Sequence, residues 1–237
     1  MEKVLILGAA GQIGTELVNT LRATYGNDQV IAGDLLAANL SEPCIQIDAT
    51  DEHALRELVT KEGVTVVYQL VAMLSATGEK LPEKAWALNM QALFAVLNLA
   101  KDQLIKQVFW PSSIAAFGPN TPTLDSPQMT VMDPTTVYGI SKLSGELWCQ
   151  YYHDKYGVDV RSIRYPGLIS WGAEPGGGTT DYAIDIFRSA KKDNAYTCFL
   201  AEDTRLPMMH MDDAIRATLE LMNAPKEQLS IWTSYNV

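Results

Sequence analysis

Cysteine and histidine are scarce in this sequence, which has three of each among its 237 residues. The cysteines, Cys44, Cys149 and Cys198, lie far apart, and neither a CxxC pair nor a Cys/His cluster occurs. Disulfide frameworks and structural zinc sites need paired thiols or closely spaced ligands. We therefore expect no disulfide and no metal site, and a reducing compartment suits the protein.

Long apolar runs and an excess of basic residues are also missing. No apolar run approaches the roughly 20 residues that cross a bilayer, and nothing at the start of the chain resembles a secretory signal. The 18 basic and 28 acidic residues give a formal charge of −10, which repels phosphate backbones. We expect a cytoplasmic protein that binds neither a membrane nor nucleic acid.

Short apolar runs alternate with stretches of helical period along most of the chain. The expected strands cover residues 3–8, 29–35, 44–48, 64–72, 105–113, 158–167, 196–201 and 229–237. The expected helices cover residues 12–26, 51–63, 82–103, 135–157, 181–193 and 211–225; Asp51 is placed to cap the second and Asp212 lies near the start of the last. This order predicts an α/β fold: a Rossmann-type doubly wound parallel sheet, followed by a smaller C-terminal lobe.

Three glycines separate the first expected strand from the first helix, in the segment GAAGQIG. At this place Gly8 allows a tight turn, Gly11 lets the backbone approach a pyrophosphate, and Gly14 lets the helix pack against the strand. The start of the helix then presents free N–H groups and the positive end of its dipole to phosphates. The segment predicts a dinucleotide cofactor.

Two acidic residues follow the next two expected strands. Asp34 lies 20 residues after Gly14, where a carboxylate accepts hydrogen bonds from the adenosine ribose hydroxyls. Since no arginine follows it to accept a 2′-phosphate, we expect NAD rather than NADP as the cofactor. Asp48 could either reach the adenine amino group or cap the following helix, and the sequence leaves both open.

Tyr138 and Lys142 are four residues apart on an expected helix, so their side chains share one face. A free tyrosine has a pKa of about 10, and a neighbouring ammonium together with the positive ring of NAD would favour the phenolate. Such a tyrosine can take a proton from a substrate hydroxyl. Ser112 or Ser113, after the fifth expected strand, could donate a hydrogen bond to the same oxygen.

The segments GAAGQIG, WPSSIAAFG and YGISK resemble the extended branch of the short-chain dehydrogenase/reductase family along nearly the whole chain. Within that branch, PTTVYGISK, SIRYPGLISW and PGGGTTDYAIDIF resemble the short-chain type of L-threonine 3-dehydrogenase. The resemblance implies a catalytic serine at Ser113, with Ser112 as the fallback, a base at Tyr138, and Lys142 as its modulator and ribose anchor. It also implies a homodimer. The implied NAD contacts are Gly8, Gly11, Gln12, Ile13, Gly14, Asp34, Asp48, Leu70, Ala72, Tyr138, Lys142 and the turn at Tyr165 to Gly167.

The implied substrate, L-threonine, presents an ammonium, a carboxylate and a hydroxyl group. Thr179, Thr180 and Asp181 could supply hydroxyls and one negative charge, in a glycine-rich loop able to close over the substrate. Ser75 could contact the substrate carboxylate, and Ser113 and Tyr138 could contact the substrate hydroxyl. Thr180 or Asp181 could equally cap the next helix, and both roles are compatible.

We expect an NAD-binding domain at residues 1–167 and a substrate lobe at residues 168–237. Members of the extended branch are usually longer, so we expect part of the substrate lobe to be missing from this chain. The predicted reaction is NAD-dependent oxidation of the β-hydroxyl of L-threonine to 2-amino-3-ketobutyrate. The alternatives are a nucleotide-sugar epimerase or dehydratase with the same fold, and a non-catalytic NAD-sensing protein.

Overall fold

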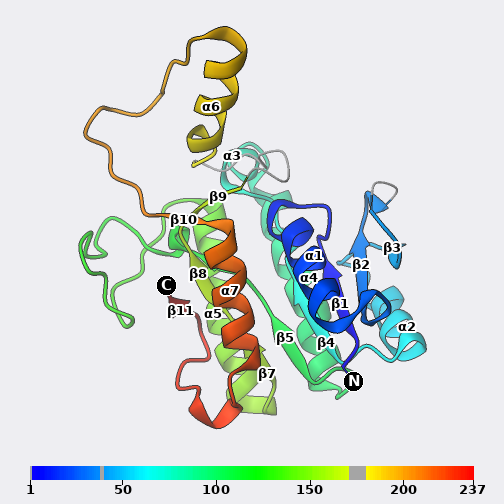
Figure 1. Ribbon diagram of the computed structural model, residues 1–237. Coiled ribbons are helices and arrows are strands. Elements are labelled where there is room, and N and C mark those ends of the chain that lie inside the picture. Colours follow the sequence, from blue (N-terminus) through cyan, green and yellow to red (C-terminus); the bar gives the residue numbers. More distant parts are fainter. Residues whose placement is uncertain (1, 38–39, 171–179) are drawn as a thin grey trace.

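A six-stranded parallel sheet forms the centre of the computed structural model, which describes residues 2–37, 40–170 and 180–237 (Figure 1). The strand order is β3-β2-β1-β4-β5-β7. The strands are β1 (Val4–Leu7), β2 (Val30–Asp34), β3 (Cys44–Gln46), β4 (Val66–Gln69), β5 (Gln107–Phe109) and β7 (Asp159–Arg161). This order reverses direction between β1 and β4, and in such sheets ligands bind at the carboxyl ends of the strands beside the reversal.

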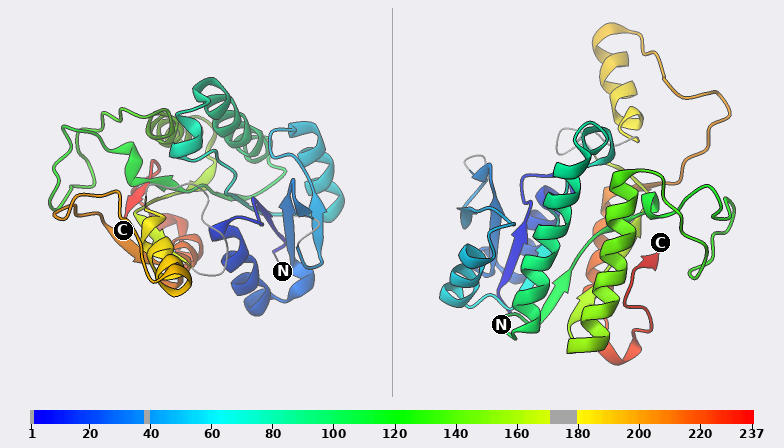
Figure 2. Two further views of the ribbon diagram at one scale, coloured as in Figure 1. Left: turned by 90° about the horizontal axis from the view of Figure 1, so that it is seen from above. Right: turned by 180° about the vertical axis from the view of Figure 1, so that it is seen from behind.

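Helices cover both faces of the sheet, as the alternating pattern predicts (Figures 1 and 2). On one face lie α1 (Gln12–Tyr25) and α7 (Met211–Asn223), whose buried side chains join one apolar cluster with β1 and β4. On the other lie α2 (Glu52–Glu62), α4 (Pro82–Lys101) and α5 (Val137–Tyr156). The predicted α/β doubly wound fold is confirmed. Asp51 caps α2 as expected, because its carboxylate accepts a hydrogen bond from the Ala54 backbone N–H.

Two predicted strands are interrupted, and the interruptions create a second sheet. The strand expected at 105–113 divides into β5 and β6 (Ser112–Ser113), and the one at 158–167 into β7, β8 (Ile163–Tyr165) and β9 (Gly167–Ile169). Pro111 has no N–H to continue the ladder beyond Trp110. β6 pairs instead with β8, which also pairs with β11 (Tyr235–Asn236), the remnant of the strand expected at 229–237.

The strand predicted at residues 196–201 does not form. These residues are irregular, and Phe199 in their middle is 68% exposed, since no strand lies beside them to pair with their backbone. Instead, β10 (Met208–His210) pairs with β9 in the parallel direction. α6 (Tyr182–Asp193), which comes between β9 and β10 in the chain, projects from the body of the molecule (Figure 1).

The remaining elements are short: α3 (Ser75–Gly78) and the 3-10 helices η1 (Asn27–Gln29), η3 (Ile114–Ala116) and η4 (Lys226–Gln228). Because α7 packs beside α1, residues 168–237 contribute to the covering of the main sheet. The domain boundary at residue 167 stays a prediction. No helix within the described residues is long and apolar enough to cross a membrane.

Candidate active site

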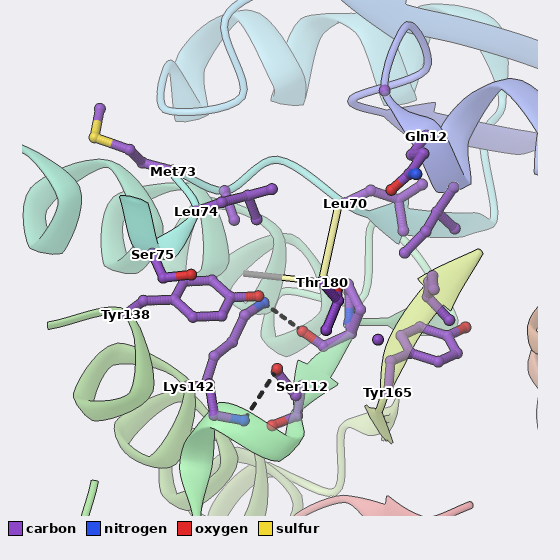
Figure 3. A pocket seen from close by; sticks show the side chains of 18 of the residues that line it. Gln12, Leu70, Met73, Leu74, Ser75, Ser112, Tyr138, Lys142, Tyr165 and Thr180 are labelled. Atoms are coloured by element: carbon purple, nitrogen blue, oxygen red, sulfur yellow. Dashed lines mark hydrogen bonds between the residues drawn. The ribbon is translucent and has the colours of Figure 1, made fainter. Parts of the chain in front are cut away.

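A cavity of about 700 Å³ opens at the carboxyl ends of the strands, where the strand order reverses (Figure 3). It is bordered by the glycine loop, the segment after β4, β6 with η3, the start of α5, and the turn after β8. The predicted site residues that line it are Gly8, Gly11, Gln12, Ile13, Gly14, Leu70, Ala72, Ser75, Ser112, Ser113, Tyr138, Lys142, Tyr165, Thr180 and Asp181. Thr179 lies outside the described residues.

The glycine loop has the shape that a dinucleotide phosphate needs. Gly8 adopts a φ of +83°, and a methyl group on Gly14 would collide with the Gly8 carbonyl oxygen and the Ala9 backbone. Gly11 is the N-cap of α1 and provides no side-chain cap, and the first turn of that helix carries no acidic residue. Gln12 Nε2 is buried without a hydrogen-bond partner among the described residues. These free donors fit a phosphate-bearing cofactor.

Asp34 lies beside this loop but outside the cavity lining. One carboxylate oxygen accepts from the Ala10 N–H at 3.0 Å and the other from the Leu36 N–H at 3.0 Å. A carboxylate has lone pairs for further bonds, so its place next to the loop suits a ribose. Asp48 is exposed, and its side chain accepts from the Thr50 N–H and hydroxyl. The suggested helix cap at Asp48 is therefore wrong, because Asp51 caps α2.

Close packing brings Tyr138 to Ser113. A side chain on Gly139 would collide with the Ala115 carbonyl oxygen, so only glycine lets the start of α5 approach η3. Ser113 Oγ accepts from the Ala115 N–H at 3.1 Å, and Ser113 acts on the Tyr138 hydroxyl to lower its pKa. Ser112 instead donates its hydroxyl to Glu146 at 2.5 Å. Of the two serines, Ser113 is the one that acts on the tyrosine.

Burial acts against the charged forms of both Tyr138 and Lys142. Burial raises the pKa of Tyr138 to about 12, against the opposing effect of the Ser113 hydrogen bond. Burial also lowers the pKa of Lys142 to about 7, although Cys149 and Glu146 oppose the fall. Without the cofactor, desolvation disfavours both charged forms, so the role expected of Lys142 and the NAD ring together in favouring the phenolate stays a prediction.

Lys142 is anchored at the cavity wall by contacts with backbone and aromatic rings. Its ammonium donates to the Pro111 carbonyl (Figure 3). The ammonium lies 4.6 Å from the ring centroid of Trp110 and 5.5 Å from that of Tyr138. A cation over an aromatic face is attracted by the ring quadrupole. These contacts give the buried ammonium favourable partners and fix its place at the cavity wall.

Thr180 and Ser75 both line this cavity (Figure 3). Thr180 packs directly on Gly167, where an added Cβ would lie 2.5 Å from the threonine Cγ2. Ser75 begins α3. Asp181 stands at the N-cap position of α6 but makes no side-chain capping bond to it. The alternative in which Asp181 serves only as a cap therefore loses its support.

Asn89 is a residue of the site region that the sequence patterns did not single out. Its amide is buried and bonds both the N–H and the C=O of Met73, at 2.7 and 3.3 Å, and donates to Ser141 Oγ at 3.1 Å. Ser141 in turn donates to the Tyr138 carbonyl at 2.7 Å. Asn89 thus ties the segment after β4 to the start of α5. A lone polar residue within the apolar run AWALNM was the available signal.

No group of three or more His, Cys, Asp or Glu side chains within the described ranges could hold a metal ion. The doubly wound sheet, the glycine loop at its reversal point and a Ser, Tyr and Lys set around one cavity are features of Rossmann-fold dehydrogenases and their relatives. The NAD dependent epimerase/dehydratase family matches residues 4–237, and the chain belongs to that family. It is an enzyme of that family, and its cofactor is NAD.

Three comparisons refine the likeness. An L-threonine dehydrogenase from Cupriavidus necator, in its holo form, is 56% identical with a TM-score of 0.96, covering 99% of this chain and 77% of that one. A monomeric L-threonine 3-dehydrogenase from a metagenome is 47% identical with a TM-score of 0.95, and the match covers 99% of this chain and 76% of that one. An uncharacterized epimerase/dehydratase from Staphylococcus saprophyticus is 48% identical over 242 residues, covering 100% of this chain and 75% of the relative.

Proposed function

We propose that the protein oxidises the β-hydroxyl of L-threonine with NAD, giving 2-amino-3-ketobutyrate and NADH. The observation that carries the proposal is the convergence of Ser113, Tyr138 and Lys142 on the cavity that begins at the glycine loop. The high identity to the Cupriavidus necator dehydrogenase over nearly the whole chain supports threonine as the substrate.

The reaction removes a proton from the hydroxyl oxygen and a hydride from Cβ of the substrate. Tyr138 Oη takes the proton, and Ser113, which lines the same cavity, orients the substrate oxygen. Lys142 lies at the cavity wall, where its protonated form, which a pKa of about 7 allows near neutral pH, adds positive charge. When bound, NAD accepts the hydride and adds the positive charge of its nicotinamide ring, which favours the phenolate against the cost of burial.

The substrate's other groups meet the far wall of the cavity. The Asp181 carboxylate provides a negative charge for the ammonium, and the Ser75 hydroxyl can donate to the carboxylate. Thr180, and Thr179 beside it in the chain, add hydroxyl groups. Since Thr180 rests on Gly167, the backbone of β9 fixes the distance between this wall and the cofactor side.

The direct test is the absorbance of NADH after mixing the protein with NAD and L-threonine, with L-serine and UDP-glucose in parallel. NADH formed with threonine in preference to serine supports the proposal. Isomerised sugar from UDP-glucose, with NAD retained, would instead identify an epimerase, as the family description and the staphylococcal relative allow. Binding of NAD without turnover of any of these substrates contradicts the proposal and favours the sensing protein.

The cofactor preference has its own test. We expect a Michaelis constant for NAD at least about tenfold below that for NADP, because the Asp34 carboxylate beside the glycine loop repels a 2′-phosphate. In Asp34→Ala this difference should shrink. A preference of the unaltered protein for NADP would contradict the assignment of Asp34.

We further propose that the enzyme works in the cytoplasm as a homodimer. The three cysteines are unpaired, which suits a reducing compartment. The outer face of α4 and α5 exposes Trp86, Leu147, Trp148 and Tyr151. Rings on the two helices also touch, since the ring centroids of Phe94 and Trp148 are 4.9 Å apart. Such a contiguous apolar surface is typical of an interface. Sedimentation equilibrium decides between the dimer and a monomer like the metagenomic relative.

A further inference from the structure

A buried ion pair lies one helical turn behind the catalytic lysine. Glu146 on α5 and Arg164 on β8 are 1% and 3% exposed. The guanidinium donates to both carboxylate oxygens, from Nε at 2.9 Å and from Nη2 at 2.7 Å. Ser112 donates its hydroxyl to the same carboxylate. Burying such a pair is costly unless its geometry is well satisfied, and the proposed reaction uses neither charge directly.

Each member of this cluster adjoins a residue of the proposed active site. Glu146 follows Lys142 by four residues on α5, so the two side chains share a face of the helix. Ser112 precedes Ser113 in β6. In the parallel pairing of β6 with β8, Ser112 stands opposite Arg164 and Ser113 opposite Tyr165. The cluster therefore joins the strand that carries the serine to the helix that carries the tyrosine and lysine.

Arg164 also extends the connection to two further segments of the chain. Its Nη1 donates to the Gln128 carbonyl at 3.1 Å and to Asn236 Oδ1 at 2.9 Å. Gln128 Oε1 accepts from the Asn236 N–H at 2.8 Å, which closes the ring of contacts. The arginine thus has partners in the segment between η3 and α5 and in β11, besides Glu146.

We propose that Glu146 and Arg164 are positioning residues that act through Ser112 to hold Ser113 at the correct distance from Tyr138 and Lys142. This inference rests on the proposed dehydrogenase function. β6 has only two residues, so its backbone pairing alone gives little rigidity. The Ser112 hydroxyl fixes it to a carboxylate that the arginine holds still. A displacement of about 1 Å at such a site can cost roughly 10²-fold in rate.

The deciding variant is Ser112→Ala, which removes the connection and leaves the ion pair in place, so the fold is retained. Its matched control is Ser162→Ala. Ser162 is equally buried and donates to Ser234 at 3.0 Å, but it has no bond to α5. We expect Ser112→Ala to lower kcat by roughly 10- to 100-fold and to leave KM for NAD within about twofold, because the glycine loop is untouched. Ser162→Ala should change neither by more than about twofold.

A second variant tests the carboxylate. In Glu146→Gln, Ser112 and Arg164 compete for one remaining side-chain acceptor oxygen, so kcat should fall as in Ser112→Ala. The double variant should then lose less than the product of the two single losses. Equal turnover of Ser112→Ala and wild type, or fully multiplicative losses in the double variant, would overturn the proposal. If Glu146→Gln does not fold, the comparison of Ser112→Ala with Ser162→Ala still decides.

A measurement without substrate separates this inference from the proposed function. The ¹³Cζ NMR signal of Tyr138, assigned with Tyr138→Phe, reports the environment of the tyrosine hydroxyl, on which Ser113 acts. We expect the chemical shift of this signal to change in Ser112→Ala and to stay the same in Ser162→Ala. Such a result in a protein that does not oxidise threonine would retain the positioning role and reject the substrate. An unmoved signal in Ser112→Ala would reject the positioning role.

Discussion

The two walls of the active-site cavity are built in different ways. The cofactor wall, from the glycine loop to Tyr138 and Lys142, rests on buried strands and on helices packed into the two apolar clusters. The opposite wall, from Thr180 through α6, projects from the body (Figure 1), and Ile184 is the buried residue of that helix. Phe187 on α6 is 76% exposed. Under the proposed function, the contrast places the chemistry on the well-packed wall and the substrate selection on the less supported one.

The largest expected effect comes from the tyrosine on the rigid wall. Tyr138→Phe should lower kcat with threonine by about 10²- to 10⁴-fold, because the proton acceptor is lost. NAD binding, followed by titration of protein fluorescence, should persist. The control is Tyr152→Phe, which removes another hydrogen-bonded hydroxyl of α5, joined to Asn98 at 2.9 Å and away from the cavity. Comparable turnover of Tyr138→Phe and Tyr152→Phe would refute the role of Tyr138.

The next effect should appear in the glycine loop. In Gly14→Ala the new methyl group collides with the Gly8 carbonyl oxygen, so the helix must move away from the strand. Overpacking of this kind costs about 1–3 kcal/mol, and we expect roughly 10- to 100-fold weaker NAD binding by calorimetry. Gly78→Ala is the control, since its methyl group would meet only side-chain atoms at 3.4 Å. Unchanged NAD affinity in Gly14→Ala would show that the loop does not bind the phosphates.

A smaller effect is expected on the substrate wall. Gly167→Ala would press on Thr180 and on the Met208 sulfur, which would lie 2.5 Å from the added Cβ. We expect KM for threonine to rise about tenfold, with NAD affinity changed less, because Thr180 moves and the glycine loop does not. Steady-state kinetics with each substrate varied in turn measures both. A larger change for NAD than for threonine would reverse the assignment of the two walls.

A separate effect, on stability rather than on either substrate, is a pH dependence that arises from Lys142. Its pKa falls from 10.5 to about 7 on folding, so between these values the unfolded chain binds a proton that the folded chain does not. Stability therefore rises with pH across this window, relative to Lys142→Met, by about 1.4 kcal/mol per pH unit. Urea unfolding at pH 7, 8 and 9 measures the slope, with Lys106→Met as the exposed control. Parallel slopes for wild type and Lys142→Met would disprove the shift.

Much of the rigid wall follows from short stretches of sequence. The strand, glycine turn and helix at residues 4–25 form where the pattern predicts, because each depends on neighbours in the chain. The four-residue spacing of Tyr138 and Lys142 likewise places both on one face of α5. The strand predicted at 196–201 was wrong because a strand needs a neighbouring strand, which composition alone does not reveal.

By itself the sequence determined the doubly wound sheet, the dinucleotide loop and the candidate Ser, Tyr and Lys side chains, since periodicity and turn chemistry act over a few residues. Only the tertiary structure decided which serine acts on Tyr138, that Glu146 meets Arg164 and Ser112, and in which direction the pKa values of Tyr138 and Lys142 move. These outcomes depend on desolvation and on contacts between distant segments, and both exist only once the chain has packed.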